Sequence, residues 1–151
     1  MTEVAADADP RQAIRTVALG VFDAIDAHPW AGALLSRTPS LVAMPQMFEG
    51  FGEQLQALEV PERAQFDSAS ALVSYTLGVA GQNAANAHLF PHGGTDRAAF
   101  LGEAAAQWMQ LDPTRYSFVH KVAAQLPEHD DRAQFLAGID LILAGIEALT
   151  P

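Results

Sequence analysis

The chain has 151 residues, half of them apolar and 17% charged, so length and composition predict one globular domain and exclude a disordered chain. The net charge is -10, and the 8 basic residues are scattered singly, whereas nucleic-acid binding requires clustered cations, so we expect no direct contact with DNA. The sequence contains no cysteine, which excludes disulfides and thiolate chemistry.

Residues 1–9 are interpreted as a tail ahead of one helical domain that spans residues 10–151. This start has neither the basic end nor the apolar middle of a signal peptide, and no apolar run in the chain is long enough to cross a bilayer. We therefore expect a cytoplasmic protein that has no contact with a membrane.

The first helix is predicted to begin at Asp9-Pro10, because an aspartate N-cap followed by a first-turn proline starts a helix. It ends at His28-Pro29, since the residue before a proline is disfavoured in the helical region. Trp30, Leu34 and Leu35 indicate a short second helix, which Thr38-Pro39 closes. The core side of the first helix carries apolar residues at steps of three and four: Ile14, Val17, Ala18, Val21 and Ile25. Charged residues are expected on its outer side: Arg11, Arg15, Asp23 and Asp26.

The third helix is predicted to be capped by Ser40 and to be regular from about Met44, because of Pro45. Its apolar face carries large side chains, with Met47 beside it: Leu41, Met44, Phe48, Phe51, Leu55 and Leu58. Two interpretations remain open for this face. It is either ordinary core packing or a wall that faces a ligand, since methionine and phenylalanine are large and adaptable.

The long stretch from about Phe66 to Phe90 is predicted to be the central helix, and its residues fall on three stripes. A conventional core face is formed by Phe66, Ala69, Val73, Leu77, Ala80, Ala84 and Ala87. A second stripe of small residues allows another helix to approach closely and is predicted to be an interface: Ala71, Ser74, Gly78, Gly81 and Ala85. The third stripe alternates polar tips and apolar bodies, which favours a small-molecule cavity: Tyr75, Val79, Gln82 and Asn86.

Pro91 and Gly93-Gly94 are predicted to end the central helix and turn the chain. Thr95 or Asp96 caps a further helix, whose apolar residues are Leu101, Ala104, Trp108 and Leu111. Asp112-Pro113 repeats the start signal of Asp9-Pro10 and opens a segment that Pro127 closes.

The last helix is predicted to run from Asp130 or Asp131 to about Leu149, with one apolar core face: Phe135, Ile139, Ile142, Ile146 and Leu149. The opposite face carries Ala137, Gly138, Leu141, Ala144, Gly145 and Ala148. Only Asp140 and Glu147 form a polar line that is expected to face solvent. The last helix must therefore be covered on two sides, on one by the core of its own chain and on the other by something else. Paired with the same two helices of a second copy, the central and last helices would form a four-helix interface of a homodimer. The whole pattern is all-α.

This order of elements resembles the C-terminal domain of the tetracycline-repressor (TetR) family of transcriptional regulators. The matching pieces are Ala27-His28-Pro29-Trp30, Tyr75-Thr76-Leu77-Gly78, Leu111-Asp112-Pro113 and the segment from Phe135 to Leu149. The resemblance implies an all-helical domain that dimerises, binds a small effector in its core and thereby releases the operator. The family carries a helix-turn-helix ahead of this region, where this sequence offers only Met1 to Asp9. We therefore expect either a fragment or a headless regulator, and DNA binding only through a missing N-terminal domain.

The effector cavity implied by the resemblance lies between the third helix and the central one. Its predicted residues are Met44, Met47, Phe48, Phe51, Tyr75, Val79, Gln82 and Asn86, with Trp108 as a lid. A neutral lining favours a mainly hydrophobic ligand. The alternatives for Gln82 and Asn86 are solvent exposure and a polar dimer seam.

No catalytic, cofactor or metal site is predicted. His88 and His92 have a metal-like spacing, but Pro91 and Gly93 interrupt the helix that would align them and no third ligand is evident. Neither Ser74 nor Ser117 lies in a recognisable nucleophile motif. The alternative function is a helical interaction module without a ligand that forms a heterodimer with a full-length regulator.

Overall fold

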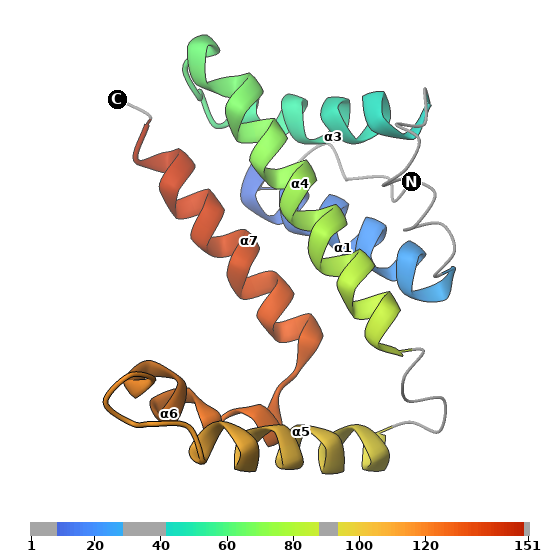
Figure 1. Ribbon diagram of the computed structural model, residues 1–151. Coiled ribbons are helices and arrows are strands. Elements are labelled where there is room, and N and C mark those ends of the chain that lie inside the picture. The colour runs from blue at the N-terminus through green and yellow to red at the C-terminus, as the bar shows by residue number, and fades with distance from the viewer. Residues whose placement is uncertain (1–8, 29–41, 88–93, 150–151) are drawn as a thin grey trace. The chain divides into compact units, whose positions relative to one another are not determined.

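The computed structural model describes residues 9–28, 42–87 and 94–149, and these residues form helices and turns with no strand (Figure 1). The elements are α1 (Pro10–Ala27), α3 (Ala43–Ala57), α4 (Glu62–Ala87), α5 (Gly94–Met109), α6 (Ser117–Ala123), the short 3-10 helix η1 (Leu126–Glu128) and α7 (Asp131–Glu147). The predicted all-α class is confirmed. Four sequence predictions lie outside the described residues: the second helix, the Ser40 cap, the pair of His88 and His92, and the turn at Pro91 and Gly93.

The chain divides into two compact units. The larger unit consists of Met1–Ala85 and Arg132–Pro151, and the smaller unit is Asn86–Asp131. The larger unit thus holds α1, α3, nearly all of α4 and nearly all of α7. The smaller unit holds α5, α6 and η1.

Helix α1 begins where the sequence predicts. The Asp9 side chain accepts a hydrogen bond from the backbone N–H of Arg11, Pro10 occupies the first helical position, and the helix ends at Ala27 with His28 as its C-cap. A proline at this position loses no hydrogen bond, because the first N–H groups of a helix have no partner within it. Both end signals are local, and both are confirmed.

The core of the larger unit joins α1, α3, α4 and α7. Its largest fully buried side chains include Ile14, Phe51, Leu55, Leu72, Phe135, Ile139 and Leu143. Phe22 of α1 packs on Phe135 of α7 with the ring centroids 4.7 Å apart. Leu143 is fully buried although the sequence pattern did not assign it to the core face of the last helix, whereas Leu149 on that predicted face is 51% exposed. Leu149 follows the end of α7 at Glu147, beyond the regular turns of the helix.

Two predictions for the core face of the central helix are wrong, because Phe66 and Ala87 are exposed. Phe66 lies near the start of α4 and is 72% exposed. Its ring is nevertheless stacked on Phe48 of α3, with the centroids 5.9 Å apart. Ala87 is the last residue of α4. The helical period is right for both positions, but they lie at the ends of the helix, where fewer neighbours cover them.

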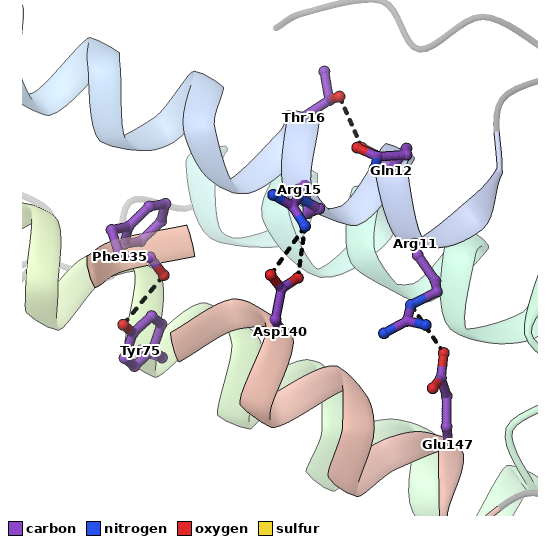
Figure 2. Close-up of polar contacts among 8 residues, drawn as sticks. All are labelled: Arg11, Gln12, Arg15, Thr16, Tyr75, Phe135, Asp140 and Glu147. Atoms are coloured by element: carbon purple, nitrogen blue, oxygen red, sulfur yellow. Dashed lines mark hydrogen bonds and ion pairs between the residues drawn. The ribbon is translucent and has the colours of Figure 1, made fainter. Parts of the chain in front are cut away.

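The predicted solvent line of the last helix is only partly right, because Asp140 and Glu147 are partly exposed but also form ion pairs with α1. Arg15 Nη1 donates to both carboxylate oxygens of Asp140 at 2.9 Å, and Arg11 Nε lies 3.1 Å from Glu147 Oε1 (Figure 2). A third ion pair of the same two helices joins Arg132 to Asp23. The residue numbers of the partners on α7 decrease as those of the partners on α1 increase. The two helices are therefore antiparallel.

In the smaller unit, the helix start predicted at Asp112-Pro113 is wrong, since α6 begins only at Ser117. Asp112 Oδ1 instead accepts hydrogen bonds from Thr114 Oγ1 at 2.7 Å and from Thr114 N at 2.8 Å. These bonds, the side-chain one foremost, lower the pKa of Asp112 below its ordinary value. An aspartate that closes a turn of this kind offers the chain an alternative to a helix. Pro127 lies inside η1 and does not end α6, whose last residue is Ala123.

A second group of polar contacts in the smaller unit lies around Asp131. Arg97 donates to Asp131 Oδ1 at 2.8 Å and to the backbone carbonyl of His129 at 3.0 Å, and His129 Nε2 lies 3.0 Å from Asp131 Oδ1. Trp108, the predicted lid, is 36% exposed and belongs to this unit.

Candidate functional site

The small-residue stripe predicted on the central helix is exposed. Ala71, Ser74, Gly78 and Ala85 of α4 are exposed, and Gly81 is partly buried. A Cβ atom added at Gly78 or Gly81 would meet nothing within 4 Å. The buried residues of α4 are others: Ser68, Ala69, Leu72, Val73, Thr76, Ala80 and Ala84. Helix α4 therefore has one side packed against its own chain and one nearly bare side.

The matching face of α7 is exposed as well. All five residues assigned there to a dimer interface are exposed: Ala137, Leu141, Ala144, Gly145 and Ala148. Leu141 is 76% exposed, and a Cβ atom added at Gly145 would meet nothing within 4 Å. Because α4 and α7 lie beside one another in the larger unit (Figure 1), this unit presents two small or apolar faces on neighbouring helices.

Tyr75 joins these two helices. Its hydroxyl donates to the backbone carbonyl of Phe135 at 3.2 Å and lies 3.5 Å from that of Gln134, and its ring is stacked on Phe135 with the centroids 5.8 Å apart (Figure 2). Burial raises the pKa of Tyr75, which further favours the protonated phenol that donates this hydrogen bond. Tyr75 thus positions α4 against α7.

Gly138 makes this contact possible. A Cβ atom built at Gly138 would overlap the Tyr75 hydroxyl and lie 2.9 Å from Tyr75 Cε2, so only glycine leaves room for the ring. By its helical spacing, Gly138 was predicted to lie on the face of the last helix opposite its core. The structure shows that Gly138 meets a side chain of its own molecule, unlike Gly145. The sequence signal for this role was a glycine inside an apolar helix. Such a glycine indicates that another group packs closely against the helix, but it does not identify that group.

The residues assigned to the effector cavity differ in how far they are buried. Met47 and Phe51 of α3 are buried in the main core, and four others are partly buried and pack against that core: Met44, Phe48, Tyr75 and Val79. Gln82 and Asn86 are exposed, and Asn86 and Trp108 belong to the smaller unit. The structure therefore brings together the apolar residues of α3 and α4, and leaves the two amides at the surface.

Thr76 is a further residue of this region, and it was not among the predicted cavity residues. It is completely buried on α4, and its hydroxyl has no hydrogen-bond partner in the part of the chain that the structure describes. Its spacing could have indicated this burial, because Val73 lies three residues before Thr76 and Ala80 lies four residues after it. That spacing places a polar residue on a stripe of α4 that is otherwise apolar.

Among the described residues, no group of three or more histidine, aspartate or glutamate side chains is arranged to hold a metal ion. None of the described helices combines the length and apolar composition that a membrane span requires.

Comparison with solved structures matches this chain to the transcriptional regulator SCO7222, a TetR from Streptomyces coelicolor. The two chains superpose with a TM-score of 0.86 and are 48% identical, and the match covers 97% of this chain and 69% of that chain. No protein-family model matches the sequence, and no curated protein matches it. Identity at this level over nearly all of its length shows that the chain belongs to the TetR family of transcriptional regulators.

Proposed function

We propose that residues 10–151 form the effector-sensing and dimerisation domain of a cytoplasmic TetR-family regulator, and that this domain binds a small hydrophobic ligand. The observation that carries the proposal is the match to SCO7222, a transcriptional regulator, over 97% of this chain. We assign no DNA contact to these residues, whose few cations are scattered singly. We also assign no catalysis to them, because membership of a family of transcriptional regulators favours regulation.

The homodimer is supported by the bare faces of α4 and α7. Both faces lack bulky side chains except Leu141, so two copies of each helix could approach closely in a four-helix interface. Such an interface would remove Leu141, now 76% exposed, from water. A neighbouring pair of helices with no charge on the assigned positions is the kind of surface that a second copy covers best.

The proposed sensing mechanism follows from α4, because this helix contributes both to the bare face and to the apolar core. Gly78 belongs to the bare face, and the next residue, Val79, packs against the core that contains Met47 and Phe51. A ligand that binds one arrangement of α4 more tightly than another would shift the population toward it, and the dimer contacts would shift with the same helix. The mainly apolar lining favours a hydrophobic ligand.

Light scattering with two leucine substitutions tests the dimer. Gly78→Leu and Gly145→Leu each add a side chain where the isolated chain has open space, so the fold is expected to tolerate them, while a close interface is not. Gly52→Leu in α3 is the matched control, since its Cβ position is also open and lies outside the proposed interface. We expect the first two variants to be monomers and the control to remain a dimer. Unchanged association in both variants would remove the proposed interface.

A thermal-shift screen of hydrophobic compounds tests the ligand. A compound that binds only the folded state raises the melting temperature. If the protein dimerises but no compound stabilises it, the alternative becomes the better interpretation: an interaction module without a ligand that pairs with a full-length regulator.

A further inference from the structure

The hydroxyl of Thr76 is buried without a partner in the middle of α4. Thr76 is completely buried, and no described residue hydrogen-bonds its Oγ1 atom. A buried hydroxyl without a partner destabilises a fold, and valine has nearly the same shape without that cost. The presence of threonine at this position therefore calls for a reason other than packing.

The chain itself shows the usual way in which a helical threonine pairs its hydroxyl. In α1, Thr16 Oγ1 donates to the backbone carbonyl of Gln12 at 2.8 Å, one turn earlier (Figure 2). Thr76 does not make the equivalent bond to Leu72. Its neighbour Tyr75, by contrast, uses its hydroxyl on α7. The hydroxyl of Thr76 therefore differs from those of Thr16 and Tyr75, which both have hydrogen-bond partners.

The surroundings of Thr76 restrict the chemistry of a partner molecule. Val73 and Ala80 share its stripe of α4 and belong to the same apolar core as Met47 and Phe51. Among the described residues, the only buried polar or charged ones are Thr76 and Ser68, so no buried charge is present to pair with an ionised ligand. An unpaired ionised group in such a place is strongly disfavoured, so a neutral molecule fits this region best.

We propose that the Thr76 hydroxyl anchors the effector by donating a hydrogen bond, and that the effector is a neutral, mainly apolar molecule with a carbonyl-type acceptor. A hydroxyl has one proton to donate, and a carbonyl oxygen accepts it without bringing a donor of its own that would need a further partner. This inference rests on the proposed ligand-binding function. It adds a residue, a direction of hydrogen bonding and a ligand class to that function.

Two probe molecules of nearly the same shape test the anchor. Benzophenone carries a ketone between two phenyl rings, and diphenylmethane carries a methylene group at the same place. Their affinities are measured from the dependence of the melting temperature on probe concentration, at one fixed protein concentration. We expect the wild-type protein to bind the ketone about tenfold more tightly than the hydrocarbon, which is the effect of one hydrogen bond.

The Thr76→Val variant should lose this preference, and Thr76→Ser should keep it. Without a probe, Thr76→Val should melt at a higher temperature than the wild type, because it removes a hydroxyl that has no partner in the free protein. A lower melting temperature of Thr76→Val would overturn the inference by showing that the hydroxyl is already paired. Equal affinities for the two probes, no binding of either, or a ketone preference that survives in Thr76→Val would overturn it too.

The same experiment separates this inference from the broader proposal. If other hydrophobic compounds that carry a carbonyl acceptor stabilise the wild type and Thr76→Val equally, a ligand site exists and the anchor is wrong. If no compound stabilises either protein, the ligand-binding proposal itself fails.

Discussion

Replacing Gly138 by alanine tests the contact between α4 and α7 most sharply. The new methyl group would overlap the Tyr75 hydroxyl and lie 2.9 Å from Tyr75 Cε2, closer than real Cβ contacts come. The tyrosine ring must therefore move. Its movement would break the hydrogen bond to the Phe135 carbonyl and the stacking on the Phe135 ring.

The size of the effect follows from these contacts. A hydrogen bond of this kind contributes about 1 kcal/mol, and an aromatic pair contributes about 1 kcal/mol beyond its buried area. Overpacking strain adds about 1 to 3 kcal/mol where the ring cannot move away freely. Against these losses, alanine is favoured over glycine inside a helix by about 1 kcal/mol. We expect Gly138→Ala to lower the free energy of unfolding by about 2 kcal/mol or more.

Chemical denaturation of five proteins at one fixed concentration measures this effect: the wild type, Gly138→Ala, Gly52→Ala, Tyr75→Ala and the double variant of Tyr75→Ala with Gly138→Ala. The control is Gly52→Ala in α3, where the added Cβ meets nothing within 4 Å, so it should be stabilising by about 1 kcal/mol. In a Tyr75→Ala background the obstacle is gone, and Gly138→Ala should change sign and become stabilising. If Gly138→Ala is as stabilising as the control in the wild-type background, the reasoning from this contact is refuted.

Three smaller predictions concern single contacts. Glu59 has a left-handed backbone conformation with φ at 58°, which strains a residue with a side chain, so Glu59→Gly should raise the free energy of unfolding by about 0.5 to 1 kcal/mol in urea denaturation. Arg15→Met breaks the ion pair with Asp140, whose partly exposed side chains limit the loss to about 0.5 kcal/mol at low salt; the same measurement in concentrated salt should show almost no difference. The lowered pKa of Asp112 stabilises its turn at neutral pH, and this contribution is lost as the pH falls through the folded-state pKa; Thr114→Val should raise that pKa toward its ordinary value in an NMR titration.

Local signals account for much of the fold that the sequence predicted, and a repeated signal shows their limit. Asp9-Pro10 starts α1, but the same pair at Asp112-Pro113 starts no helix. Both aspartates accept a hydrogen bond from the backbone N–H two residues further on, but only Asp112 also accepts one from a hydroxyl there, that of Thr114, and this additional bond favours a turn. Capping residues show where a helix can begin, while competing local hydrogen bonds decide whether it does.

Periodicity identified the helices, but it could not identify what covers each stripe. Asp140 and Glu147 appeared as a solvent line because acidic residues on a helix usually face water, yet their partners lie on α1, more than a hundred residues earlier. Such pairs are recognisable from the sequence only once the antiparallel order of the two helices is known. The exposure of Phe66 has the same origin, since a period gives the direction of a side chain and not the extent of the neighbouring helix.

The candidate site was predictable in its residue types and less so in its contacts. The bare faces of α4 and α7 follow from small residues at helical spacing, and their exposure in the single chain agrees with that spacing. The roles of Gly138 and Thr76 could not be derived in that way. Gly138 matters because of the ring that lies against it, and Thr76 because of a hydrogen bond that it lacks, and both facts depend on neighbours distant in the sequence.

The accessibility of one engineered thiol tests the central claim, that a second copy of the chain covers the bare face of α7. The natural sequence has no cysteine, so Leu141→Cys introduces a single thiol at a position that is 76% exposed in the isolated chain, and Glu53→Cys provides an exposed control on α3. We predict that the thiol of Leu141→Cys reacts with a labelling reagent at least about tenfold more slowly than the control, and that adding Gly78→Leu and Gly145→Leu abolishes this protection. Equal labelling rates for Leu141→Cys and Glu53→Cys at high protein concentration would contradict the account.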